Sequence, residues 1–335
     1  MKILNIDKLN LILILASFTL ACFLPFEFFL FAYAFLGPLH YLTETNWIAD
    51  KNYFVSNSYW KYLVLAAAII YSIPYVFSLS ILSKLINESA IAFLIYKIGE
   101  YSNFVLFFIL ISAVLALFYK TYKVFVFSFI IAILLSFWTY TTEAYLLING
   151  VLLPTIIHVY LFTLLFMMYG VKKKKSIYGI LNIILIIALP LSLIFLDTGI
   201  FNYQFSEGVK NTYLNNNFHL LNANLAKLFG VYEDLKFFFY EKIDLKIQIF
   251  IAFAYIYHYL NWFSKTTIIG WHKQLTTKKA LGILGIWIVI LLCYLYDYRL
   301  GLVISIFLSV SHVMLEFPLN IITIKSLFSK RKKTT

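Results

Sequence analysis

Histidines and carboxylates recur at helical spacing near the ends of three apolar segments, and these residue types suit metal chemistry. His40 and Glu44 are four residues apart, so they share one face of a helix. His312 and Glu316 repeat this spacing, and His258 lies in a third segment. Imidazole and carboxylate together suit iron, zinc or manganese, and a histidine-rich set with open positions suits ferrous iron and oxygen chemistry. The spacing therefore predicts a transition-metal site, with iron favoured.

The predicted metal ligands are histidines from three different segments and one loop. His40, His258 and His312 would each supply one imidazole nitrogen. His272, in the basic loop after the segment that holds His258, would complete the set. Heme held by two facing histidines is an alternative cofactor for the same residues. Isolated histidines near helix ends also form hydrogen bonds between membrane helices without any ligand, and this second interpretation stays open.

Further polar residues beside these histidines predict catalytic and substrate-positioning roles. Glu44 and Glu316 would be ligands themselves, or would hold the second nitrogen of a ligating imidazole, as carboxylates commonly do. Asn261 and Lys265 fall on the same helical stripe as His258. They would position a polar head or an anionic group of the substrate.

A secondary polar pair is expected nearer the opposite membrane face. Glu143 and His158 lie in consecutive apolar segments joined by a short turn. The pair would be an element of a proton relay or a structural contact, because buried ionisable residues in membranes serve both purposes.

Composition sets the class of protein that must position these residues. The chain of 335 residues is 62% hydrophobic and 13% charged, with a mean hydropathy of +0.87. Soluble domains carry about 25% charged residues, so lipid must be the solvent for most of this chain. The two cysteines, Cys22 and Cys293, lie in apolar runs and predict no disulfide framework. We therefore expect an all-α, polytopic bundle of transmembrane helices that forms a single membrane domain over residues 1–335.

The hydropathy pattern predicts about nine or ten spans, because a spanning helix needs about 20 apolar residues. Pro25 separates the first two segments. The predicted segments are 10–24, 26–44, 60–82, 103–119, 123–147, 151–170, 177–196, 247–264, 280–297 and 301–317.

Lysine clusters predict the orientation of the bundle. Positive charge concentrates on cytoplasmic loops, and here it lies at 172–175, at 278–279 and at 330–333. These positions place both termini in the cytoplasm and make 197–245 an extracytoplasmic cap of amphipathic helices. The expected location is a bacterial inner membrane. The net charge of +12 flanks apolar runs, so we expect contacts with membrane lipids and no binding of nucleic acid.

Three local runs resemble a group of uncharacterised bacterial polytopic membrane proteins. The runs are Gly37–Glu44, His258–Lys265 and His312–Pro318. This resemblance spans most of the chain and implies a multi-pass membrane fold without naming an activity.

A second resemblance concerns the Gly/Pro-flanked histidine that an acid follows. His40 and Glu44 are similar in this respect to the membrane-embedded carotene-cleaving oxygenases of the Brp/Blh family. Those polytopic proteins are thought to hold iron through intramembrane histidines, so the resemblance implies iron and an oxygenase reaction. The glycine that usually follows the histidine in that family is Tyr41 here, and the spacing to the acid differs.

These observations predict a metal-dependent integral-membrane oxidoreductase that acts on a lipid or isoprenoid near the cytoplasmic leaflet. The second resemblance implies that this enzyme is an oxygenase. The alternative is a transporter or channel whose pathway the intramembrane histidines and glutamates line. The sequence contains no Walker phosphate loop, no dinucleotide-binding glycine motif and no zinc-protease HExxH motif. Transport driven by ATP is therefore not predicted.

Overall fold

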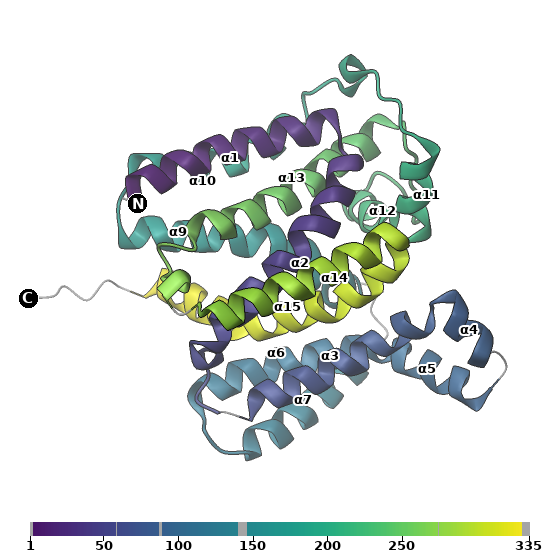
Figure 1. Ribbon diagram of the computed structural model, residues 1–335, viewed down its shortest axis with the longest axis vertical. Coiled ribbons are helices and arrows are strands. Elements are labelled where there is room, and N and C mark those ends of the chain that lie inside the picture. The colour runs from purple at the N-terminus through teal and green to yellow at the C-terminus, as the bar shows by residue number, and fades with distance from the viewer. Residues whose placement is uncertain (1–2, 58, 87–88, 140–145, 274, 330–335) are drawn as a thin grey trace, which may run out of the picture.

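The computed structural model describes residues 3–57, 59–86, 89–139, 146–273 and 275–329, and this described part is helical without a single strand (Figure 1). The all-helical class predicted from composition is confirmed. The elements are α1 (Ile3–Phe23), α2 (Glu27–Ala49), η1 (Asn52–Phe54), α3 (Trp60–Phe77), α4 (Ser80–Ile86), α5 (Ala90–Glu100), α6 (Ser102–Phe118), α7 (Lys123–Thr139), η2 (Leu146–Phe162), α9 (Thr163–Lys173), α10 (Ile177–Ser192), η3 (Thr198–Phe201), α11 (Glu207–Asn215), α12 (His219–Leu228), α13 (Lys242–Lys265), η4 (Trp271–Lys273), α14 (Thr277–Tyr296) and α15 (Tyr298–Phe328).

The bundle has the helix lengths and apolarity of a multi-pass membrane protein. Within the described ranges, five helices are long and apolar enough to cross a membrane, and α5 with α6, bent by 46°, would make a sixth. The five are Ile6–Phe23, Trp60–Phe77, Val151–Lys173, Thr277–Tyr296 and Tyr298–Phe328.

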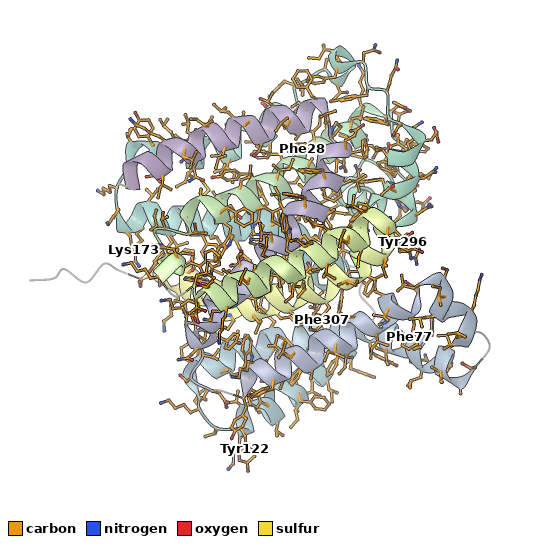
Figure 2. The ribbon with its side chains drawn as sticks, viewed as in Figure 1. Phe28, Phe77, Tyr122, Lys173, Tyr296 and Phe307 are labelled. Atoms are coloured by element: carbon orange, nitrogen blue, oxygen red, sulfur yellow. The ribbon has the colours of Figure 1, made fainter. Side chains whose placement is uncertain are left out.

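The outer surface is apolar where a soluble protein would be charged. Only 11% of the apolar window of α14 is buried inside the protein, and Leu295 and Tyr296 on this helix are 82% and 86% exposed. Figure 2 shows such side chains projecting from the ribbon, with Tyr296 and Tyr122 at the periphery. Contiguous apolar surface on this scale requires a non-aqueous partner, and the acyl chains of a bilayer provide one.

Two helices, α13 and α15, form the centre of the bundle. α13 contacts α1, α2, η2 and α12, and α15 contacts α2, α3, α6, α9 and α14. Figure 1 shows α1, α9, α10 and α13 on one side of α15 and α3, α6 and α7 on the other. A separate hydrophobic cluster occupies each side. The central helices are buried nearly all round, so their polar residues face other helices rather than lipid.

Proline marks the break between the first two helices and lies inside others. α1 ends at Phe23 and α2 begins at Glu27, so Pro25 separates the first two helices as the sequence predicts. Pro38 and Pro318 instead lie inside α2 and α15. The last predicted segment ended at residue 317, but α15 continues through Pro318 to Phe328, because neighbouring helices can compensate a proline within a membrane helix.

The stretch 197–245 consists of short helices and loops packed on one end of the bundle. α12 lies against α13, and Asn222 donates a hydrogen bond to the carbonyl of Asp244 at 2.8 Å. Phe26, at the start of α2, packs edge-on against Phe205 and Tyr213. These contacts close the end of the bundle opposite the lysine-bearing ends of α9 and α13.

Candidate metal centre

Four helices each contribute one histidine to a single buried cluster. His40 comes from α2, His158 from η2, His258 from α13 and His312 from α15. One ring nitrogen of each lies within 4.8 Å of the others. The Nε2 atoms of His40 and His258 are 3.1 Å apart, and so are those of His158 and His312. All four residues are buried, and the most accessible, His258, is only 8% exposed.

These separations match the geometry of ligands around one ion. Four nitrogens at about 2.0–2.1 Å from a tetrahedral metal lie about 3.3 Å from one another. The observed 3.1 Å distances are close to that value. The four ring nitrogens converge closely enough that this cluster could hold a metal ion.

Hydrogen bonds to the opposite ring nitrogens fix two of these imidazoles. The Thr163 hydroxyl donates to the carbonyl of Val159 and lies 2.8 Å from Nδ1 of His258, so it accepts the Nδ1 proton. Nδ1 of His312 donates to the carbonyl of Ser309 at 2.6 Å. Each ring therefore presents the Nε2 lone pair to the cluster, which is the tautomer that binds a metal.

Two buried carboxylates complete the constellation. Oε2 of Glu44 lies 3.1 Å from Nε2 of His40, and Oε2 of Glu316 lies 3.3 Å from Nδ1 of His158. The first contact is on the nitrogen that faces the cluster, which suits direct ligation by Glu44. The second is on the far nitrogen, which suits orientation of His158 by Glu316.

The charge of these carboxylates also points to a cation. Glu44 and Glu316 are 3% and 1% exposed, and neither contacts a lysine or arginine in the described part of the chain. Buried carboxylates are normally paired with a positive charge or bound to a metal. Glu44, His312 and Glu316 form a second, overlapping group with ligand atoms within the same 4.8 Å limit. A metal ion would supply the missing positive charge.

A π-helix positions His158. Residues Leu146–Phe162 form a π-helix that continues directly into α9. In a π-helix, residues five apart lie nearly in line, because the hydrogen bonds join i and i+5. His158 and Thr163, five residues apart at the junction, therefore both face the cluster. π-Helical segments are frequent at functional sites.

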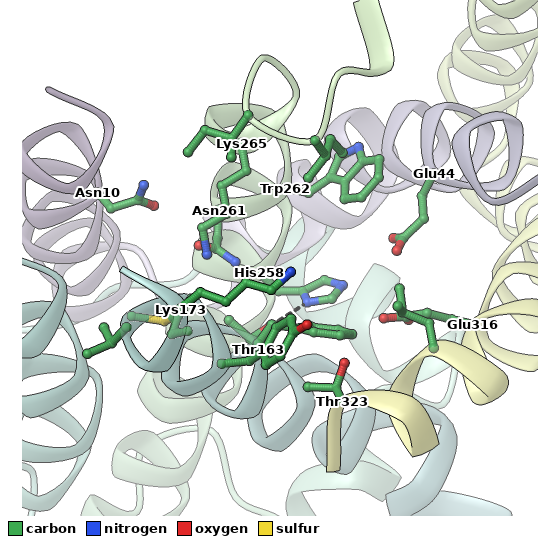
Figure 3. Close-up of a pocket in the computed structure, with 18 of the residues that line it drawn as sticks. Asn10, Glu44, Thr163, Lys173, His258, Asn261, Trp262, Lys265, Glu316 and Thr323 are labelled. Atoms are coloured by element: carbon green, nitrogen blue, oxygen red, sulfur yellow. Dashed lines mark hydrogen bonds between the residues drawn. The ribbon is translucent and has the colours of Figure 1, made fainter. Parts of the chain in front are cut away.

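A cavity of about 580 Å³ opens beside the cluster (Figure 3). His40, His258, Glu44 and Glu316 line one part of it. Lysines line another part, at the ends of α9 and α13 and just after α2, and apolar side chains lie between. The other lining residues used below are Lys51, Phe166, Lys173, Lys174, Asn261, Trp262, Lys265, Leu319 and Ile322.

The cavity lies on only one side of the histidines. On α13 its lining begins at Tyr257 and continues to Lys265, and the preceding residues Ile251–Ile256 are packed in the hydrophobic core. Tyr41 stacks on the His312 ring with centroids 4.5 Å apart, and its hydroxyl lies 2.9 Å from that of Tyr259. Neither tyrosine lines the cavity described here. Among the described residues, the cavity therefore ends at the four-histidine cluster.

The structure brings together His40, His258 and His312, three of the four histidines predicted as ligands. Asn261 and Lys265 line the cavity on the same helix as His258. His272 is not part of the cluster: it is exposed in η4, in a loop that Trp271 anchors through a hydrogen bond to Asn46.

The structure places His158 differently from the sequence prediction. The sequence assigned it to a separate pair nearer the opposite face, but its Nε2 is 3.1 Å from His312 within the cluster. The reason is that its helical stretch begins by residue 146 and continues to 173, so His158 lies near the middle. Glu143, its predicted partner, lies outside the described residues.

Sequence reasoning also missed Thr163 and Lys173. Thr163 orients His258, and Lys173 reaches the cavity from the end of α9. His158 and Thr163 are five residues apart, and this spacing indicates a shared helix face only if the segment is a π-helix. Lys173 belongs to a lysine cluster that by itself indicates only topology.

Heme fits this arrangement poorly. Bis-histidine heme needs two imidazoles on opposite faces of a porphyrin plane. Here four rings approach one point, with centroids 4.7 Å apart for His40 and His258 and 4.9 Å for His158 and His312. No plane is left between them for a macrocycle.

The Thr163 hydroxyl provides a specific test of the tautomer argument. Thr163→Val keeps the side-chain shape but leaves Nδ1–H of His258 without an acceptor. We expect metal affinity to fall about 10–100-fold, as for other partners of ligating histidines. Metal competition titrations with a chromophoric chelator measure this. Thr155→Val is the matched control, because Thr155 bonds only to carbonyls of its own helix. Equal affinity in both variants would contradict the assigned hydrogen bond.

No protein-family model matches the chain, and no curated protein or solved structure matches it.

Proposed function

We propose that this protein is a metal-dependent integral-membrane enzyme whose centre is held by His40, His158, His258 and His312. The observation that carries the proposal is the convergence of four buried imidazole nitrogens within 4.8 Å at the closed end of a 580 Å³ cavity. Cavities of this size suit a small organic ligand. A purely structural metal site would need no such opening.

Iron is the favoured metal in this proposal, and the reaction is oxidative. Neutral imidazoles dominate the set, and such sets with an open position suit ferrous iron and oxygen. A metal ion here supplies Lewis-acid or redox chemistry. Among the protein's own residues, Thr163 and Ser309 hold the rings of His258 and His312 by hydrogen bonds, and Glu316 lies 3.3 Å from Nδ1 of His158. Glu44 stands beside His40 as a further ligand or as a base.

The substrate proposed is a lipid or an isoprenoid. Support comes from the apolar side chains of Phe166, Leu319 and Ile322, which line the cavity beside the histidines. In the proposed topology of nine to ten spans, both termini and the lysine-bearing helix ends face the cytoplasm of a bacterium. The cavity then opens at the inner leaflet of the inner membrane, where such substrates dissolve.

The shape of the cavity disfavours the transporter or channel alternative. A pathway needs polar residues across the whole thickness of the membrane. Here the residues on the far side of the cluster are packed core, Phe253 among them at 0% exposed. A pocket closed at one end supports a catalytic role over transport.

The proposed function predicts both a bound metal and a product. The native protein, purified without chelator, is expected to contain at least one iron or other transition-metal ion per chain by elemental analysis. Mass spectrometry of membrane lipids from one host should reveal a species formed with the wild type and absent with Glu44→Gln. Metal well below one ion per chain, or identical lipid profiles in fully metal-loaded protein, would refute the proposal.

A further inference from the structure

The open end of the cavity carries an excess of positive charge. Lysine side chains line it from three places in the chain, namely Lys51, Lys173, Lys174 and Lys265. Apart from Glu44 and Glu316 in the metal cluster, Asp7 is the one acidic side chain among the lining residues of this cavity. A ligand that enters therefore meets a positively charged rim before it reaches the histidines.

Lys173 and Lys265 are not held in place by a hydrogen bond or an ion pair in the described part of the chain, although Lys173 lies 4.7 Å from the ring of Tyr169. The neighbouring Lys172 behaves differently: its ammonium donates to three carbonyls near the end of α15 at 2.7–2.9 Å. Lys265 is also half-buried, and Asp7, which lines the same cavity, is the acidic residue that interacts with it electrostatically without forming an ion pair. A half-buried ammonium in this position favours a bound anion.

The lysines and the histidines are separated by a defined length. Lys265 follows His258 by seven residues on α13, which is about 10 Å along a helix axis. Trp262, Phe166 and Leu319 line the space between them. Figure 3 shows Asn261 and Lys265 beyond His258 on the same helix, with Lys173 extending into the cavity from α9. The cavity therefore combines a cationic end, an apolar middle and a metal-binding end.

We infer that the rim binds the phosphate head of an amphipathic substrate whose apolar chain extends to the histidines. A phosphate monoester carries close to two negative charges at neutral pH and several acceptor oxygens, which suits a group of unpaired lysines better than a single carboxylate does. Asn261 can add a donor, since its Nδ2 has no partner in the part of the chain that the structure describes. This inference rests on the proposed function and specifies its substrate class.

The spacing also defines the reacting position. With the head at Lys265, the part of the substrate chain about 10 Å away along α13 lies near His258. Chemistry is thus expected at an interior position of the chain, and not at the phosphate itself.

Binding of dodecyl phosphate to the purified protein in a nonionic detergent tests the inference. We expect saturable binding by isothermal titration calorimetry. Lys173→Gln and Lys265→Gln should each weaken it about tenfold or more, through loss of a charge-assisted hydrogen bond. Lys265→Arg, which keeps the charge, should retain most of the affinity. The control Lys278→Gln removes an exposed lysine on α14 that does not line the cavity, and it should leave binding unchanged.

Further ligands and one variant separate the sources of affinity. Inorganic phosphate should bind far more weakly than dodecyl phosphate, and dodecanol should not show lysine-dependent binding. If inorganic phosphate bound as tightly as dodecyl phosphate, the inference of an amphipathic ligand would be wrong. If Lys278→Gln weakened binding as much as Lys173→Gln and Lys265→Gln do, the inference of a defined site at the cavity rim would be wrong. His258→Gln tests independence from the metal. Dodecyl phosphate binding that persists in metal-free protein supports the anion site even if the proposed enzyme function fails.

Discussion

Replacing His258 with glutamine is expected to remove the bound metal almost completely. Glutamine has a similar length and can still occupy the space beside Thr163, but it has no imidazole nitrogen to bind the metal. Losing even an orienting partner costs about 10–100-fold in affinity, so loss of a ligand should exceed about 100-fold. His312→Gln should behave alike, because its Nε2 is fixed toward the cluster in the same way. Elemental analysis of protein purified without chelator measures the effect.

His272→Gln is the matched control for these ligand variants. His272 is an exposed histidine in η4 and lies outside the cluster, so its loss should leave the metal content unchanged. Each variant should first give a single symmetrical peak in size-exclusion chromatography, which separates metal loss from misfolding. Full metal occupancy in folded His258→Gln and His312→Gln would disprove the four-histidine centre.

Removal of the metal is expected to lower the stability of the whole bundle. A ligand that binds only the folded state contributes about 3–4 kcal/mol at 100–1,000 times its Kd. In the stripped protein the Nε2 lone pairs of His258 and His312 face other imidazoles at 3.1 Å, without a cation between them. We expect chelation to lower Tm by about 5 °C or more and metal addition to restore it.

The stability effect should vanish where the site is absent. A His258→Gln and His312→Gln double variant should show the same Tm with and without metal, and it should resemble the stripped wild type. Thermal unfolding in detergent, followed by tryptophan fluorescence, makes this comparison. A metal-dependent rise in the double variant would place the stabilising metal elsewhere in the protein.

The class of fold was predictable because it depends on bulk properties of the chain. With 62% hydrophobic residues, the sequence leaves no alternative to burial in lipid, and the pattern of apolar runs marks most of the helices. α2 and α13 pass no simple test for a membrane span. They carry polar residues of the candidate site, including Glu44 and Asn261, and these residues lower their mean hydropathy.

The candidate site was predictable only in part. His40 and His312 are each followed by a glutamate four residues later, and His258 shares a helical stripe with Asn261 and Lys265, so periodicity marked each histidine as part of a polar helix face. Their convergence depends on how the helices pack, which spacing within one helix does not encode. His158 did not, because its depth depends on where a helix begins and on a π-helix that no residue pattern marks. Lys173 was hidden for another reason: its role depends on the packing of α9 near α13, which sequence spacing does not encode.

The four histidines are distributed over nearly the entire chain, from α2 near its beginning to α15, the last helix. During synthesis, the first imidazole thus enters the membrane long before the last one leaves the ribosome. Under the proposed function, metal binding would therefore follow insertion of α15, and a chain that lacks α15 would lack the His312 ligand. If the cluster holds an ion as proposed, its binding would report on complete assembly, because only a molecule with α2 and α15 in contact brings these histidines together.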